Sequence, residues 1–124
     1  MIDIVERLAN QDKRYHKDAF YYVARAIESS HEKIRRKERK RRHITGQELV
    51  AEVVDLASDD FGRLAELVFD AWGVRTTLDI GEIVFLMVAN GILSAQESDS
   101  KEDFRDVCEF AHAFDRDYNA YDLG

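Results

Sequence analysis

The sequence predicts a mainly α-helical fold, a compact domain of five to six helices. Apolar residues recur at three- and four-residue spacing along much of the chain, which places them on one face of a helix. Two strings, Thr45–Glu48 and Thr76–Asp79, have the form of capping boxes, which mark the first turn of a helix. The 124 residues include no proline, so the residue that most often breaks a helix is missing throughout.

The first two helices are predicted from apolar spacing. A short helix at the start of the chain places four apolar residues on one face: Ile2, Val5, Leu8 and Ala9. A second helix begins near Tyr15, and its positions i, i+3, i+4 and i+7 are apolar: Phe20, Val23, Ala24 and Ile27. The apolar pattern stops at Ile34, although this helix could continue through a basic stretch to Arg42.

Local capping signals predict the next two helices. Thr45 and Glu48 can each accept from the other's backbone N–H, and Ile44 and Leu49 stand at the positions of a hydrophobic staple. This third helix is predicted to bury the following residues: Leu49, Val50, Val53, Val54 and Ala57. Asp59 or Asp60 is predicted to cap a fourth helix with one apolar face: Phe61, Leu64, Ala65, Val68 and Trp72. Gly73 suits the left-handed position after this helix, with Phe69 and Val74 as the accompanying contact.

The fifth helix is predicted to be the most buried element. Thr76 and Asp79 form its capping box, and its inward residues are Ile80, Ile83, Val84, Met87 and Val88. Phe85 and Leu86 make it apolar nearly all round, which is typical of an interior helix. Gly91 ends it, with Met87 and Ile92 as the contact pair.

The C-terminal third allows two interpretations. Residues 92–96 and 105–110 could pair as a short β-hairpin, and three helices followed by a hairpin is the winged-helix layout. Alternatively, Phe104, Val107, Cys108 and Ala111 fit one further helix. We treat residues 1–124 as a single domain: N-terminal helices in 1–42, a helical core in 43–114 and a tail in 115–124 that is expected to fray.

Charge is divided unevenly along the chain, whose net charge is −7. Residues 1–45 hold 13 Lys and Arg against 7 Asp and Glu, whereas residues 46–124 hold 5 against 18. The two parts therefore carry net charges of +6 and −13. Such asymmetry often marks an interaction surface. The alternatives are that the two parts attract each other within one molecule, or pair head to tail between copies.

A basic run is the main candidate site. Eight of the ten residues from 33 to 42 are cationic: Lys33, Arg35, Arg36, Lys37, Arg39, Lys40, Arg41 and Arg42. Such a density can neutralise phosphates and release counterions, which gives salt-sensitive binding to RNA or DNA. The alternative is a solvated helix end. The run lacks the apolar face of a membrane-surface helix, so we expect no membrane partner.

Sequence-specific DNA recognition is disfavoured. In a winged helix the fifth helix would read the groove, yet residues 78–90 contain no Lys or Arg. Asp79 and Glu82 would meet phosphates with the wrong sign, and only Asn90 has a side chain suited to base edges.

No motif for catalysis, a cofactor or a metal is present. The four histidines form no paired-ligand spacing, and no glycine-rich phosphate loop occurs. The carboxylates at Asp99, Glu102, Asp103 and Asp106 could form an acidic helix stripe, but they lack the spacing of a calcium loop. We therefore expect no enzyme, no cofactor and no metal site. The single cysteine, Cys108, and the absence of a signal-peptide pattern or a long apolar run favour the cytoplasm.

Four strings carry a resemblance to a known family: residues 42–49, 69–74, 81–85 and 103–107. Together they resemble a small family of uncharacterised bacterial proteins from Planctomycetes, Verrucomicrobia and related lineages, over residues 18–114. The resemblance implies a bacterial, cytoplasmic domain and supplies no activity, ligand or catalytic residue. The connection before Arg42 is more basic here than in that family, so the basic run is expected to be particular to this protein.

These observations together favour a non-enzymatic interaction or regulatory module that binds a protein or an RNA-containing partner. The first alternative is a nucleic-acid-binding protein that uses residues 33–42. The second is a small enzyme whose active site is assembled from scattered residues.

Overall fold

The computed structural model describes residues 2–93 and 101–114, and within these ranges the secondary structure is helical. The α-helices are α1 (Ile2–Gln11), α2 (Lys17–Glu38), α3 (Gly46–Phe61), α4 (Ala65–Trp72), α5 (Thr77–Ala89) and α6 (Phe110–Phe114). Two 3₁₀ segments accompany them, η1 (Gly62–Leu64) and η3 (Lys101–Phe104). The prediction of a mainly helical fold is therefore confirmed.

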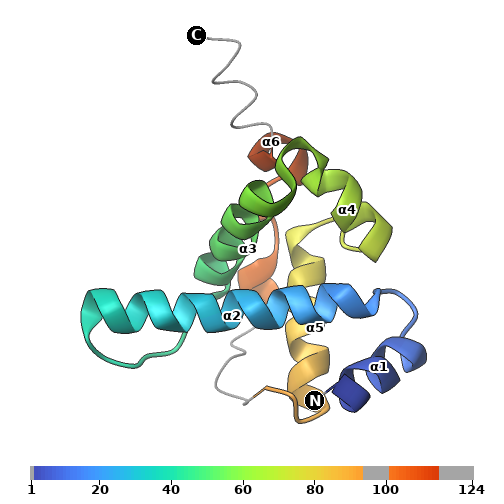
Figure 1. The fold of residues 1–124 in the computed structure, drawn as a ribbon, viewed down its shortest axis with the longest axis horizontal. Helices are drawn as coiled ribbons and strands as arrows, with labels where there is room; N and C mark the ends of the chain where they lie inside the picture. The colour runs from blue at the N-terminus through green and yellow to red at the C-terminus, as the bar shows by residue number, and fades with distance from the viewer. Residues whose placement is uncertain (1, 94–100, 115–124) are drawn as a thin grey trace, which may run out of the picture.

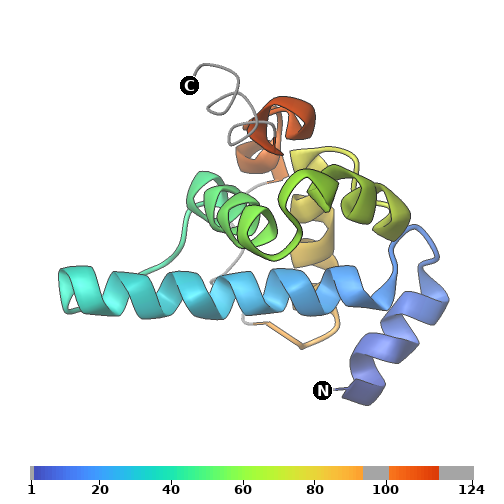
Figure 2. The ribbon, with the colours of Figure 1, turned by 45° about the horizontal axis from the view of Figure 1, so that its top comes forward.

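The long helix α2 is the element against which most of the other helices pack. It contacts α1, α3, α4 and α5. In Figure 1 it runs horizontally across the molecule, with α1 beside its N-terminal end and α5 crossing it. Its C-terminal end extends beyond the other helices before the chain turns back to α3, and Figure 2 shows the same projection from a second direction.

The core lies where α2, α3 and α5 meet. Phe20 of α2, Val53 of α3 and Ile83 of α5 are almost completely buried. On α5, Ile80, Val84 and Met87 are buried as well, which agrees with the prediction that this helix lies deepest. An aromatic cluster links α2, α3, α4 and α6: Tyr22, Phe61, Phe69, Trp72, Phe110 and Phe114.

The predicted caps are present. At the start of α3, Glu48 N–H donates to Thr45 Oγ1 at 3.1 Å, and Thr45 N–H donates back to Glu48 Oε1 at 3.0 Å. At the start of α5, Thr76 N–H donates to Asp79 Oδ2 at 3.1 Å, and Asp79 N–H donates to the backbone oxygen of Thr76 at 3.1 Å. Gly73 has a φ of 88°, and the N–H of the next residue donates to Phe69 O at 2.8 Å.

The end of α5 repeats this pattern. Gly91 has a φ of 75°, and Ile92 N–H donates to Met87 O at 2.8 Å. These backbone bonds confirm the predicted Schellman motifs at Gly73 and Gly91 and join the residues of each predicted pair, Phe69 with Val74 and Met87 with Ile92.

The predicted start of the fourth helix was wrong. Asp59 and Asp60 do not cap it, since α3 continues through both and ends before Gly62, which has a φ of 56°. The Asp60 carboxylate instead accepts from Tyr22 Oη and Arg25 Nη1, both at 2.8 Å. Of the predicted apolar face, Leu64 is 62% exposed, whereas the other members are buried or pack against the core: Phe61, Ala65, Val68 and Trp72.

The basic run ends α2 rather than extending it. The helix stops at Glu38, and Arg39 takes a left-handed conformation with a φ of 56°. Its backbone N–H donates to Arg35 O at 2.9 Å. Continuation of the helix to Arg42 was therefore wrong, and residues 40–42 lie in the connection to α3.

The described residues do not support the hairpin or a winged helix. No strand occurs in residues 92–93 or 101–114, whereas 94–96 lie outside the described part. The hydroxyl of Thr77 donates to Phe104 O and accepts from Val107 N–H at 3.2 Å, so backbone groups that a strand would pair are bound to α5. The alternative of one helix through Phe104 and Ala111 was also wrong, because η3 and α6 are separated by Asp106 at a φ of 51°.

Candidate interaction site

The eight cations of the basic run fall into two groups. Three form ion pairs within the fold: Lys33, Arg36 and Arg42. The other five are exposed and form no ion pair with any residue that the structure describes: Arg35, Lys37, Arg39, Lys40 and Arg41. We call these five residues the basic tip.

Arg42 anchors the connection that carries the basic tip. Its guanidinium donates to Glu38 at the end of α2 (Nη2 to Oε2, 2.8 Å) and to Glu48 in the first turn of α3 (Nη2 to Oε2, 2.8 Å). A further bond joins Nη1 to His43 O at 3.0 Å. The guanidinium, followed by the Thr45 backbone N–H, lowers the pKa of Glu48 to about 2. Arg42 thus closes the loop between two helices.

Lys33 and Glu52 form a second ion pair between α2 and α3, and its carboxylate is buried. Glu52 is only 6% exposed, and its two oxygens accept from Lys33 Nζ and Ser29 Oγ, both at 2.6 Å. The hydrogen bond to Glu52 raises the pKa of Lys33, since it stabilises the charged ammonium. Through the buried Glu52 this pair is part of the packing between α2 and α3, although Lys33 itself is 63% exposed.

Arg36 pairs with Glu32 at 2.7 Å on the exposed surface of α2. An exposed i, i+4 pair of this kind contributes only about 0.3 to 0.5 kcal/mol. Arg36 therefore remains accessible beside the basic tip.

The basic tip occupies the part of α2 that projects from the molecule. Arg35 and Lys37 lie on the last helical turn, Arg39 ends it, and Lys40 and Arg41 begin the return to α3. Figures 1 and 2 both show this end of α2 standing clear of the other helices. Five cations are therefore presented to solvent at one extremity.

The contacts partly match the idea that the two oppositely charged parts of the chain attract each other. Three ion pairs cross between residues 1–45 and 46–124 near α3: Lys33–Glu52, Arg25–Asp60 and Arg42–Glu48. Among the described residues, none of these pairs involves the basic tip. Internal attraction therefore accounts for some of the cations of the first part but not for the tip.

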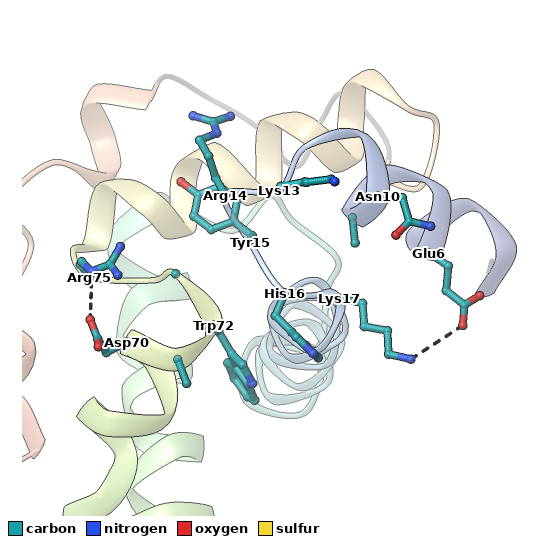
Figure 3. A pocket seen from close by; sticks show the side chains of 13 residues that line it. Glu6, Asn10, Lys13, Arg14, Tyr15, His16, Lys17, Asp70, Trp72 and Arg75 are labelled. Carbon is teal, nitrogen blue, oxygen red and sulfur yellow. Dashed lines mark hydrogen bonds and ion pairs between the residues drawn. The ribbon is translucent and has the colours of Figure 1, made fainter.

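A polar cavity lies at the opposite end of α2. It has a volume of about 820 Å³ and is lined by parts of α1, the α1–α2 connection and the turn between α4 and α5. Four cations line it, namely Lys13, Arg14, Lys17 and Arg75, together with the carboxylates of Glu6 and Asp70. Figure 3 shows Lys17 reaching toward Glu6 of α1, His16 between Lys17 and Trp72, and Arg75 beside Asp70 on the far side.

The cations of the cavity differ in how firmly they are held. Arg14 donates to both oxygens of Asp12, at 2.9 and 2.7 Å. Arg75 Nε donates to Asp70 Oδ1 at 2.9 Å. In contrast, Lys17 Nζ is 3.9 Å from Glu6 Oε1.

The residues singled out for metal or redox chemistry are dispersed. No group of three or more His, Cys, Asp or Glu able to hold a metal occurs within the described ranges. His16 caps α2, and His112 Nδ1 lies 3.2 Å from Glu109 on the surface. Cys108 is half-buried, and this burial raises the pKa of its thiol, which disfavours the reactive thiolate.

The predicted acidic stripe does not form. Glu102 pairs with Arg105 at 2.8 Å, and the left-handed backbone at Asp106 interrupts any helix through these carboxylates. Asp99 lies outside the described residues.

The position of α5 bears on DNA recognition. Its central residues Ile83 and Val84 are fully buried between neighbouring helices. Of α5 only Ala89 is exposed, and residues 78–90 contain no Lys or Arg, the side chains that most often contact a DNA groove.

Two interactions had no clear signal in the sequence. Tyr15 is buried and its hydroxyl donates to Asp79 Oδ1 at 2.6 Å, 64 positions away. Glu52 stands in an apolar run between Val50 and Val53, and a carboxylate at such a position is the signal that could have revealed a buried ion pair.

No helix in the described part of the chain is long and apolar enough to cross a membrane. Comparison with known proteins finds no matching family model, no matching curated protein and no matching solved structure. The resemblance to a small bacterial family therefore stays a prediction.

Proposed function

We propose that this protein is a non-enzymatic interaction module that binds the phosphates of an RNA-containing partner through the basic tip. One observation carries the proposal. Five cations gather at the projecting end of α2 and form no ion pair within the described structure, while the three others of the same run are used in or beside the helix packing.

Folding alone gives no reason for such a cluster. Arg35 on the last turn of α2 and Arg39 at its cap stand four positions apart, a spacing at which like charges repel, and Lys37, Lys40 and Arg41 are close to them in the chain. Repulsion of this kind costs a few tenths of a kcal/mol per pair. A polyanion would turn the repulsion into attraction and release counterions on binding.

The negative charge of the rest of the molecule restricts where a nucleic acid can bind. The whole chain has a net charge of −7, so a polyanion is repelled by most of the molecule. Charges on the surface act over about 10 Å at 0.1 M salt, so the basic tip is screened from the acidic helices behind it. A nucleic acid would therefore contact the tip and little else.

Recognition of this kind is independent of base sequence. Phosphate contacts position a nucleic acid, whereas base edges specify it. The tip offers cations on a helix end and a loop, and the buried α5 offers no groove reader. We expect single-stranded RNA to bind with little preference for sequence.

The test is a filter-binding titration of single-stranded RNA at several salt concentrations. Five phosphate contacts predict that the logarithm of the binding constant falls against that of the salt concentration with a slope of roughly −3.5. The triple variant Arg39→Gln, Lys40→Gln, Arg41→Gln should reduce this slope by about 2. A matched control neutralises Arg7, Lys101 and Arg105, which changes the net charge equally. No retention at low salt, or equal loss in both triple variants, rejects the proposal.

A protein partner is the second candidate, and a separate feature favours it. Leu64 and Leu67 are 62% and 68% exposed on neighbouring turns of η1 and α4. Two exposed leucines three positions apart offer an apolar contact to a partner protein. A pull-down that survives nuclease but is lost on Leu64→Ser and Leu67→Ser would select this candidate over RNA.

A further inference from the structure

We propose that the cavity at the N-terminal end of α2 is a binding site for a small phosphorylated molecule. This site goes beyond the proposed contact with RNA and lies at the other end of the same helix. Three features of the cavity support this assignment: a fixed wall, donors without a close carboxylate partner, and a volume suited to a small molecule.

The wall of the cavity is held by the backbone. His16 N–H donates to Trp72 O at 3.0 Å, which ties the start of α2 to the end of α4. Gly73 lies so close to the α1–α2 connection that an added Cβ would overlap the carbonyl oxygen of Arg14. Tyr15 is buried beside them and bonded to Asp79. The cavity therefore has a preformed shape on this side.

His16 supplies a donor whose orientation is set by the fold. Its Nδ1 accepts from the backbone N–H of Asp18 at 3.0 Å as the cap of α2. An accepting Nδ1 carries no hydrogen, so the hydrogen of the neutral ring is on Nε2. That N–H is left as a donor on a ring that lines the cavity.

Lys13 and Lys17 provide the positive charge. Lys13 forms no ion pair with any residue in the described part of the chain. The ammonium of Lys17 reaches the nearest oxygen of Glu6 only at 3.9 Å, the long contact drawn in Figure 3. Arg14 and Arg75 are already bound to carboxylates at less than 3 Å. Lys13, His16 and Lys17 are thus the donors that a ligand can use.

The chemistry of these donors selects a phosphate group. Ammonium groups and a ring N–H are donors that neutralise and hydrogen-bond the oxygens of a phosphate. The space of about 820 Å³ lies in the range of small-molecule sites, which is far larger than an inorganic ion requires. Trp72, Ala71 and Ala9 also line the cavity and offer apolar surface to an organic group attached to the phosphate.

The cavity and the basic tip are separate sites. The helix α2 has 22 residues, which at about 1.5 Å per residue puts its two ends about 33 Å apart. This distance is several times the range over which exposed charges act at 0.1 M salt. Failure of one proposal therefore leaves the other intact.

Trp72 allows a direct measurement, because it is the only tryptophan in the sequence and it lines the cavity. Pyrophosphate is titrated into the full chain at constant ionic strength, with Trp72 fluorescence and calorimetric heat as two readouts. We expect saturable binding by at least one readout. The double variant Lys13→Gln, Lys17→Gln should weaken it at least tenfold, whereas the control Lys101→Gln, Arg105→Gln should leave it unchanged.

Three further results decide the assignment. The tip variant Arg39→Gln, Lys40→Gln, Arg41→Gln should bind pyrophosphate like the unmodified chain. Citrate, which carries carboxylates, should bind at least tenfold more weakly than pyrophosphate, and equal binding overturns the choice of phosphate. Absence of saturation in both readouts, or equal weakening by the two double variants, overturns the site.

Discussion

Arg42 and Glu48 face each other in a two-point hydrogen bond, with Nη1 to Oε1 at 2.9 Å and Nη2 to Oε2 at 2.8 Å. The same carboxylate closes the capping box of α3 by accepting from Thr45 N–H. One glutamate thus fixes both the start of α3 and the last cation of the basic run. This relationship separates cations that support the loop from cations that the loop presents.

Neighbouring arginines should therefore have opposite roles. Arg42→Gln removes the bonds to Glu38 and Glu48 and should lower the free energy of unfolding, by more than Arg41→Gln does. Arg41→Gln removes no ion pair and should change it by less than about 0.5 kcal/mol. RNA affinity should respond in the opposite order, with the larger loss for Arg41→Gln. Urea denaturation and filter binding on both variants test this, and parallel losses would contradict it.

Lowering the pH should reduce the free energy of unfolding, because Glu48 becomes protonated and its hydrogen bonds to Arg42 and Thr45 weaken. Its pKa is lowered from 4.5 to about 2 in the folded protein, so its contribution is complete above about pH 4.5. The contribution is lost as the pH falls from 4.5 toward 2. In this interval the unfolded state has already bound a proton at Glu48, whereas the folded state binds it only near pH 2. The side chain is 38% exposed, and solvent screening reduces the effect to about 1 kcal/mol.

The measurement is thermal unfolding between pH 5 and pH 2. Glu48→Gln should show a smaller loss of stability over this interval than the unmodified chain. Glu66→Gln, an exposed change on α4, serves as the control and should retain the full loss. Identical pH dependence in Glu48→Gln and the unmodified chain would show that this carboxylate contributes nothing.

Replacing the buried Glu52 should lower the free energy of unfolding more than replacing its exposed partner Lys33. Glu52→Gln keeps the shape but weakens two hydrogen bonds of 2.6 Å, and should cost about 1 to 2 kcal/mol. Lys33 is 63% exposed and can turn to water, so Lys33→Gln should cost less, although it leaves the carboxylate with Ser29 alone. Glu28→Gln on the exposed side of α2 is the control for urea denaturation. A cost for Glu52→Gln no larger than that of the control would refute the structural role.

The sequence was sufficient wherever the determining contacts were local. Glu48 lies three residues from Thr45, and Ile92 lies five residues from Met87, so both caps could be predicted from short strings. The start of the fourth helix could not, because Asp60 is engaged by Tyr22, 38 positions away. The path of the C-terminal third depends on the Thr77 hydroxyl, which binds backbone groups 27 and 30 positions away.

The same distinction applies to the candidate site. The eight cations were visible as a run, and residues 33–42 do form an exposed basic end. Their division into supporting and presented groups depends on where Glu52 falls when α3 packs on α2, 19 positions from Lys33. The polar cavity has no sequence signature at all, since its walls come from residues 6–17 and 70–75.

Two glycines offer a matched test of how rigidly the cavity wall is built. Gly73 and Gly91 both end a helix with a positive φ, 88° and 75°. A Cβ on Gly91 would meet open space, so Gly91→Ala should cost only the left-handed conformation, about 1 kcal/mol. A Cβ on Gly73 would also collide with the backbone of Arg14, so Gly73→Ala should cost at least about 3 kcal/mol. Urea denaturation of both variants compares the two costs. Equal losses would mean that the α1–α2 connection can move away from α4, and that the wall beside Trp72 is not fixed by this contact.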